Sequence, residues 1–142
     1  MKTVYVATSL THVKTDAEKK ELRDFLAWLV TEFNIKLLKW AFDTDTWSPE
    51  PVENIYEYDT NMVKEADLVI ALYLSDAGSD GRGGEVVNRI EVAKKPIRSF
   101  AKEGVRVSRY PADCFKKHHV PIQTFKDFKE MAPAIREALE LL

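Results

Sequence analysis

The chain has 142 residues, of which 45% are hydrophobic and 31% charged, and its formal net charge is −2. This length fits one domain, residues 1–142, with a core of its own. The small net charge argues against a nucleic-acid polymer or a membrane surface as the main partner and favours a small-molecule ligand. Cys114 is the only cysteine, so an internal disulfide is excluded. No apolar run is long enough for a signal peptide or a membrane span, so we expect a cytoplasmic protein.

Strands and helices are predicted to alternate along the first half of the chain. Thr15 and Glu18 form a capping signal at the start of an amphipathic helix. Residues 67–74 are almost entirely apolar, which is typical of a strand buried on both faces of a parallel sheet. The predicted elements are a strand at 4–7, a helix at 15–33, a strand at 35–42, a helix at 55–66 and a strand at 67–74.

The second half continues the alternation. A glycine-rich loop at 75–84 precedes a helix that we expect to begin at Glu85 and to end at Lys94–Pro96. Strands follow at 97–100 and 120–125, and in the terminal helix Pro133 either kinks the helix or opens its main part. The pattern predicts an α/β protein with a doubly wound, five-stranded parallel sheet of order 2-1-3-4-5, the flavodoxin-like arrangement.

A ligand site is expected where segments 8–12 and 75–85 meet, at the switch point beyond the carboxyl ends of strands 1 and 3. The glycine-rich loop lacks a Gly-Lys-Ser/Thr ending, which argues against ATPase chemistry. Glu85 is expected in the first helical turn, where the helix dipole would keep it ionised as a nucleophile. Its position alone is equally consistent with a stabilising acid at a helix start.

Two further residues are candidates for the same site. Asp59 lies on the apolar stripe of its helix, where an acid is costly unless it is paired or faces a ligand. A helix edge or a local cap is the alternative. Tyr5 lies near the carboxyl end of the first strand, where a buried hydroxyl usually finds a partner, although core packing is the commoner role.

Together these positions resemble the nucleoside 2-deoxyribosyltransferase family, and within it the small branch of 2'-deoxynucleoside 5'-monophosphate N-glycosidases. The resemblance spans most of the chain, and its core is a Gly-x-Gly-x-Glu run that ends at Glu85, with Asp59 about 26 residues upstream. The matching segments are Tyr5-Val6-Ala7-Thr8-Ser9, Ala66-Asp67-Leu68-Val69-Ile70-Ala71, Ser79-Asp80-Gly81-Arg82-Gly83-Gly84-Glu85 and Lys95-Pro96.

The resemblance implies a role for each matching residue. Glu85 would attack the anomeric carbon, Tyr5 would orient that carboxylate, and Asp59 would protonate the departing base or hold the sugar. Substrate contacts would come from strand 1 and the glycine-rich loop, with a phosphate contact from Ser108 of a neighbouring subunit. The remaining residues of the implied substrate site are Thr8, Ser9, Ser79, Asp80, Gly81 and Gly83.

The implied reaction is cleavage of the N-glycosidic bond of 2'-deoxynucleosides or their 5'-monophosphates through a covalent glycosyl-glutamate, with transfer to another base or to water, as in nucleotide salvage. Where the monophosphate branch has an arginine and glycines, this chain has Leu10-Thr11-His12, so the need for a 5'-phosphate stays open. The alternatives are a non-catalytic nucleotide-binding module and a glycohydrolase of ribonucleotide or NAD-like donors.

The resemblance also bears on cofactors and assembly. No organic cofactor is implied, and the expected assembly is a homodimer or a higher homo-oligomer with shared active sites. Cys114, His118 and His119 lack the usual ligand spacing, so we predict no metal site.

Overall fold

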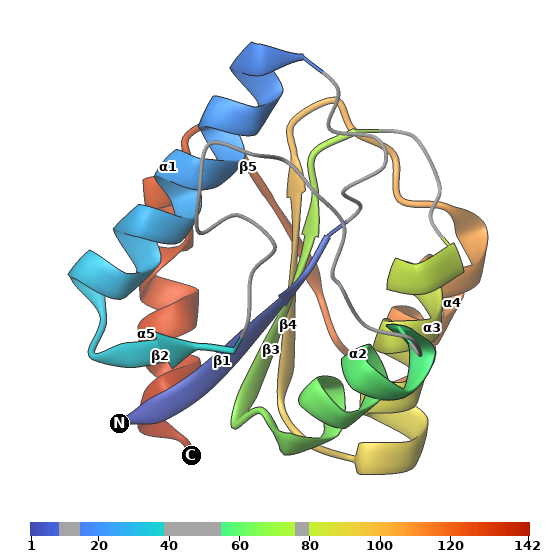
Figure 1. Cartoon of the computed structure of the whole chain (residues 1–142). Coiled ribbons are helices and arrows are strands. Elements are labelled where there is room, and N and C mark those ends of the chain that lie inside the picture. The colour runs from blue at the N-terminus through green and yellow to red at the C-terminus, as the bar shows by residue number, and fades with distance from the viewer. Residues whose placement is uncertain (9–14, 39–54, 76–79) are drawn as a thin grey trace.

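A computed structural model describes residues 1–8, 15–38, 55–75 and 80–142. In this part of the chain, five parallel strands form one sheet of order β2-β1-β3-β4-β5, with helices on both faces (Figure 1). The predicted flavodoxin-like α/β fold and strand order are therefore confirmed. No helix in these segments is both long and apolar enough to cross a membrane.

The elements have the following bounds. The strands are β1 Lys2–Ala7, β2 Ile35–Leu37, β3 Leu68–Tyr73, β4 Ile97–Lys102 and β5 Ile122–Phe125. The α-helices are α1 Asp16–Glu32, α2 Ile55–Glu65, α3 Asp80–Val87, α4 Arg109–Lys117 and α5 Ala132–Glu140. Helix α3 continues without a break into a π-helical stretch, η1 Asn88–Ala93, and a 3₁₀ turn, η2 Phe128–Met131, precedes α5.

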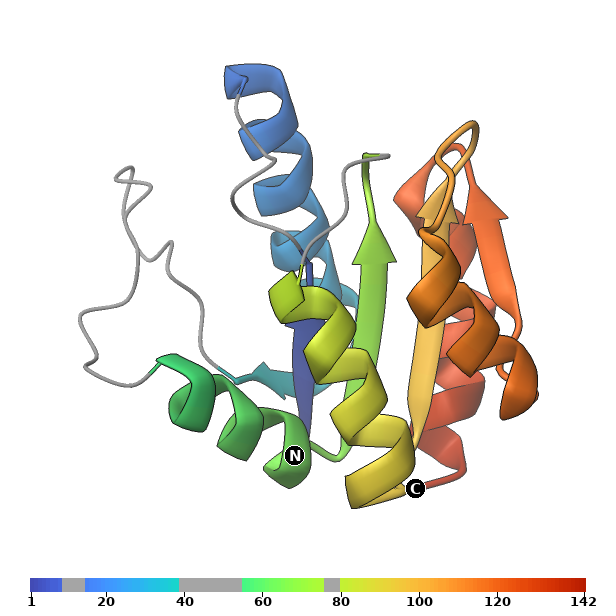
Figure 2. The ribbon, with the colours of Figure 1, turned by 90° about the vertical axis from the view of Figure 1, so that its right-hand side faces the viewer.

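The sheet separates two hydrophobic cores because successive side chains of a strand point to opposite faces. Val4 and Val6 of β1 pack into the core beneath α1 and α5, whereas Tyr5 and Ala7 pack into the core beneath α2, α3 and α4. The views in Figures 1 and 2 show the same division of helices between the two faces. All six residues of β3 are buried, as expected of a strand covered on both sides.

Several predicted boundaries agree with the structure. Helix α1 begins after Thr15, whose hydroxyl accepts a hydrogen bond from the Glu18 amide at 3.1 Å. Pro133 lies in the first turn of α5, so it opens that helix, as one of the two alternatives predicted. We predicted a strand at 35–42, and the structure has β2 over Ile35–Leu37. Residues 39–42 of the predicted strand lie outside the described residues.

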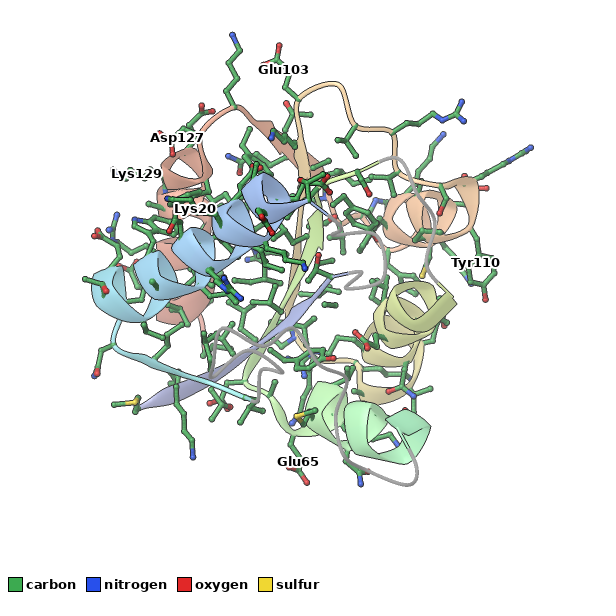
Figure 3. The ribbon with its side chains drawn as sticks, turned by 45° about the horizontal axis from the view of Figure 1, so that its top comes forward. Lys20, Glu65, Glu103, Tyr110, Asp127 and Lys129 are labelled. Atoms are coloured by element: carbon green, nitrogen blue, oxygen red, sulfur yellow. The ribbon has the colours of Figure 1, made fainter. Side chains whose placement is uncertain are left out.

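Helix α4 was not predicted. Its only buried residues are Pro111 and Phe115, so it carries too few apolar residues to show a helical period. Tyr110 is 70% exposed and points away from the rest of the fold (Figure 3).

Thr3 and Asp67 link the amino ends of β1 and β3. The Asp67 carboxylate accepts hydrogen bonds from the Thr3 amide at 2.8 Å and the Thr3 hydroxyl at 3.1 Å, and the Asp67 amide donates to the Thr3 hydroxyl oxygen at 3.0 Å. The bond from the Thr3 amide is the main reason that the pKa of Asp67 lies below its ordinary value of 3.8. These bonds hold the amino ends of β1 and β3 together, and the switch point lies between the carboxyl ends of the same two strands.

Candidate active site

Tyr5 is placed near the carboxyl end of β1, on the face covered by α2, α3 and α4. Its side chain is 7% exposed. Ala7 pairs in register with Ala71 of β3, so two of the smallest side chains lie beside each other on this face, next to Tyr5. The neighbouring strands β1 and β3 are the two between which the chain reverses its direction of winding, and this is the switch point predicted above.

Glu85 meets Tyr5 across this switch point. The Tyr5 hydroxyl donates a hydrogen bond of 3.0 Å to Oε1 of Glu85, in a partly buried setting. Strand β1 supplies the donor, and the helix that follows β3 supplies the acceptor. Two of the three residues predicted to be catalytic are therefore in direct contact, although they lie 80 residues apart in the chain.

The predicted position of Glu85 within its helix is wrong. We expected the helix to begin at Glu85, but α3 begins at Asp80, so Glu85 lies in the second turn. The glycines at 81–84 suggested a loop, yet they adopt helical backbone here. Because the effect of the helix dipole falls off after the first turn, it acts only weakly at Glu85. The hydrogen bond from Tyr5 is one interaction that holds the carboxyl group of Glu85 in place.

Arg89, one helical turn after Glu85, anchors this helix and was not predicted. Its side chain is fully buried and its guanidinium donates four hydrogen bonds to main-chain carbonyls. The acceptors are Pro96 at 3.0 Å, Val63 and Ala66 at 2.7 Å each, and Asp67 at 2.9 Å. Burial lowers the pKa of Arg89 to about 10, an effect that the negative charge of Asp67 partly opposes. Arg89 thus satisfies carbonyls at the end of α2 and ties α2 to the helix that carries Glu85.

The structure describes the other predicted site residues to different extents. Thr8 follows β1 directly and is half-buried, and Gly83 is buried within α3. Ser9 and Ser79 were also predicted for this site, and both lie outside the described residues. Asp59 of α2, and Asp80 and Gly81 of α3, have described backbone, but their side chains lie outside the description.

Ser108 is the residue before the first turn of α4. It is exposed, and its side chain makes no capping hydrogen bond to the helix. Capping of α4 therefore does not account for a serine at this position.

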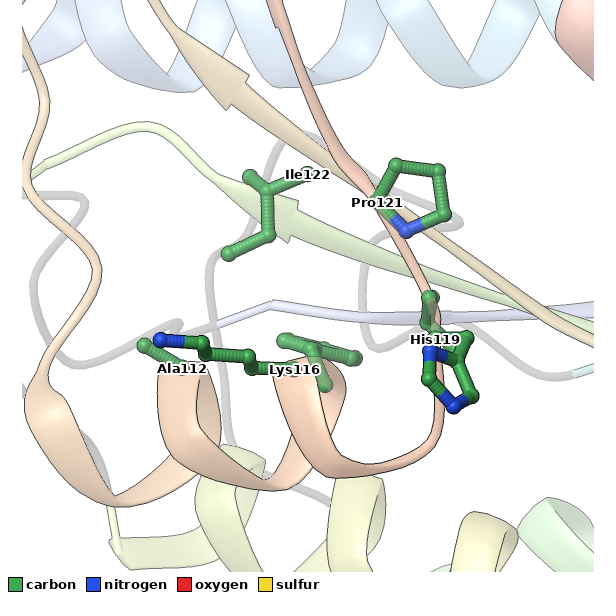
Figure 4. A pocket seen from close by; sticks show the side chains of 7 residues that line it. Ala112, Lys116, His119, Pro121 and Ile122 are labelled. Carbon is green, nitrogen blue, oxygen red and sulfur yellow. The ribbon is translucent and has the colours of Figure 1, made fainter.

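An open groove lies elsewhere, between α4 and the edge strand β5 (Figure 4). Its lining includes none of the residues predicted for the site. The groove is lined by Ala112, Phe115, Lys116, His119, Val120, Pro121 and Ile122. It is therefore separate from the Tyr5–Glu85 pair.

A group of possible metal ligands is also present within the described segments. One ligand atom from each of Glu91, Cys114 and His118 lies within 4.8 Å of the other two. The prediction from sequence considered Cys114 with its two neighbouring histidines and missed Glu91, because Glu91 is far away in the chain.

Comparison with known proteins identifies the fold. No protein-family model matches the chain, and no curated protein matches it in sequence. Among solved structures, the chain resembles the Clostridium botulinum CMP N-glycosidase BcmB, with a TM-score of 0.65 and 20% sequence identity. The likeness covers 95% of this chain and 98% of that one. At this identity the likeness establishes a common fold over nearly the full length of both chains.

Proposed function

We propose that this chain is an enzyme of the nucleoside 2-deoxyribosyltransferase family that cleaves the N-glycosidic bond of 2'-deoxynucleosides or their 5'-monophosphates, with Glu85 as the nucleophile. The observation that carries the proposal is the hydrogen bond of 3.0 Å between Tyr5 and Glu85. It holds a carboxylate at the edge of the sheet where ligands of this fold class bind. The shared fold with a CMP N-glycosidase is consistent with this chemistry.

In the first step, the Glu85 carboxylate attacks the anomeric carbon of the sugar as the bond to the base breaks, giving a glycosyl ester and the free base. In the second step, water or another base attacks the same carbon and the carboxylate is released. Tyr5 orients the carboxylate for attack. Its hydrogen bond also stabilises the negative charge that returns to Glu85 when the ester breaks, so it favours the second step as well.

The remaining assignments rest on the family resemblance and on placement in the fold. Asp59 is proposed to protonate the departing base, and Thr8 and Ser9 to contact the substrate from the end of β1. Ser79, Asp80, Gly81 and Gly83 are proposed to bind the sugar or its phosphate from the segment before Glu85. The start of α3 supports an anion site because its free amide groups attract negative charge.

The direct test is release of free base, measured by chromatography. The donors are deoxynucleosides, deoxynucleoside monophosphates and CMP, each with and without an acceptor base. We expect Glu85→Gln to abolish release and Tyr5→Phe to lower kcat about 10- to 100-fold, the usual effect of losing a hydrogen bond to a charged group. Glu65→Gln is the matched control, because Glu65 ends α2 and points away from the fold (Figure 3).

Each outcome of this assay separates the alternatives. Equal release by wild type and Glu85→Gln would overturn the role of Glu85. A nucleotide that raises the melting temperature but is never cleaved would identify a binding module instead. Equal rates with deoxyribose and ribose donors would favour a glycohydrolase of ribonucleotide or NAD-like molecules.

Rapid quenching during turnover tests the covalent intermediate. Wild-type protein should gain the mass of the glycosyl group on the peptide that contains Glu85, whereas Glu85→Gln should not. An enzyme that turns over rapidly but never carries the adduct would act by direct displacement with water.

We further propose that the protein is a homo-oligomer in which Ser108 reaches the phosphate site of a neighbouring subunit. The exposed hydroxyl of Ser108 and its lack of a capping role support this assignment. Ser108→Ala should raise KM for a monophosphate but not for the matching nucleoside. A monomer by light scattering would contradict the shared site.

A further inference from the structure

Glu91, Cys114 and His118 come together from two helices on the face of the sheet that also carries Glu85. Glu91 belongs to η1, and Cys114 belongs to α4, with His118 directly at its end. Cys114 and His118 are four residues apart, so their side chains lie on the same side of α4, one turn from each other. Two ligands at this i, i+4 spacing can face one metal ion from a single helix, as the two histidines of a His-Glu-x-x-His helix do, and here a third ligand from another helix, invisible in the local spacing, completes the group.

The three ligand atoms are already close to the geometry of a metal site. They lie within 4.8 Å of one another, and His118 Nε2 is 2.7 Å from Oε1 of Glu91. In a tetrahedral zinc site with bonds of about 2.0 to 2.3 Å, neighbouring ligand atoms are separated by about 3.3 to 3.8 Å. Small side-chain rotations therefore suffice to surround an ion, which would take the position of the proton between His118 and Glu91.

The chemistry of the three groups also fits. A thiolate, an imidazole and a carboxylate are the ligands that Zn²⁺ and similar ions prefer. Cys114 is half-buried, and the side chains of His118 and Glu91 are 31% and 41% exposed, so an ion can reach them from solvent. A divalent cation would replace the thiol proton, which leaves to solvent, and would neutralise the two negative charges.

Within the described segments, Lys117 is a cation that competes for Glu91. Lys117 Nζ lies 3.7 Å from Oε1 of Glu91, but its side chain is 72% exposed and can swing into solvent when an ion binds. His119 differs from His118 because it lines the groove beside β5, so the two adjacent histidines are not equivalent (Figure 4).

We propose that Glu91, Cys114 and His118 form a binding site for a divalent transition-metal ion of the Zn²⁺ class, with a fourth position open to water. The ion would cross-link η1 to α4. Since Glu91 lies more than one helical turn beyond Glu85, the ion acts as a clamp between helices and takes no part in the reaction proposed for Glu85.

The test uses full-length protein without a polyhistidine tag, reduced and freed of metal with a chelator that is then removed. Titration with Co²⁺ should give one equivalent of binding, with visible bands of a tetrahedral site and a near-ultraviolet band of thiolate-to-cobalt charge transfer. Zn²⁺ should displace the Co²⁺ and raise the melting temperature. If saturating Co²⁺ gives no thiolate band with wild type, the site does not exist.

Variants assign the ligands. Cys114→Ser, His118→Ala and Glu91→Gln should each lower the affinity for Zn²⁺ at least about tenfold. The matched control is His119→Asn, because His119 has a φ of 58°, a conformation that asparagine also tolerates. Equal affinity of wild type and Cys114→Ser, or equal loss in His119→Asn and His118→Ala, would overturn the assignment. Circular dichroism of each metal-free variant shows whether it is folded, and the wild-type titration decides independently of the variants.

Discussion

Replacement of Arg89 by methionine should be the most destabilising single change in the described part of the chain that leaves the core volume nearly unchanged. Methionine fills much of the space of the arginine stem but donates no hydrogen bond. The carbonyls of Val63, Ala66, Asp67 and Pro96 would lose their bonds to the guanidinium in a region with little access to water.

The expected loss can be worked from the structure. Hydrogen bonds to a charged group contribute about 1.5 to 3 kcal/mol each, so the four bonds together contribute about 6 to 12 kcal/mol. Burial of the guanidinium offsets part of this. Desolvation disfavours the charged form and lowers its pKa to about 10, so the net contribution is smaller than the sum of the four bonds. After some relaxation of the surrounding main chain, Arg89→Met should lower the free energy of unfolding by about 3 to 5 kcal/mol.

Urea unfolding, followed by circular dichroism and by tryptophan fluorescence, measures this loss. Arg109→Met is the matched control, because the side chain of Arg109 is 94% exposed and its ion pair with Asp113, at 3.6 Å, is open to solvent. The control should change the free energy of unfolding by less than about 0.5 kcal/mol. A loss below about 1 kcal/mol for Arg89→Met would refute the view that this guanidinium holds α2 against the helix of Glu85.

Three further changes test individual features. Thr15→Ala removes the cap of α1 and its bond to the Glu18 amide, and should lower the free energy of unfolding by about 1 kcal/mol in urea titrations. Asp67→Asn should be less stable than wild type at pH 7. Because folding lowers the pKa of Asp67, this difference in stability should shrink as the pH falls below 3.8. A difference that is constant with pH would contradict the link to Thr3. Gly84→Ala, at an exposed position of α3 where a Cβ has space, should raise the melting temperature through a gain of up to about 1 kcal/mol, and no gain would argue that the helix is strained there.

The fold was predictable because the spacing of apolar residues in helices and the apolar runs of buried strands can both be read from short stretches of sequence. The apolar run at 67–74 fixed the central strand, and the Thr15–Glu18 pair marked the start of α1 within one residue. Helix α4 was not predicted because Pro111 and Phe115 are its only buried residues. Its stability comes from contacts with distant parts of the chain, which no local pattern reports.

The candidate site was predictable in part for the same reason. Tyr5 could be placed at the end of a strand and Glu85 on the helix after the central strand, so the topology alone brought them to one edge. The start of α3 at Asp80 could not be read from the sequence, because glycines ordinarily disfavour helix. Arg89 was missed since its partners are main-chain carbonyls, which carry no residue-specific signal.

The contact between Tyr5 and Glu85 has a consequence for how the protein folds. It closes a chain segment of 80 residues, and the entropy of closing a flexible loop of that length is about 4 kcal/mol by polymer theory. A single hydrogen bond returns about 1 kcal/mol, so this pair can never form by itself. It forms only after β1 and β3 have aligned, and the Glu85 carboxylate is therefore oriented only in molecules that have completed their central strand pairing. During refolding, recovery of activity should follow the slow, long-range pairing of strands and lag behind the formation of helices.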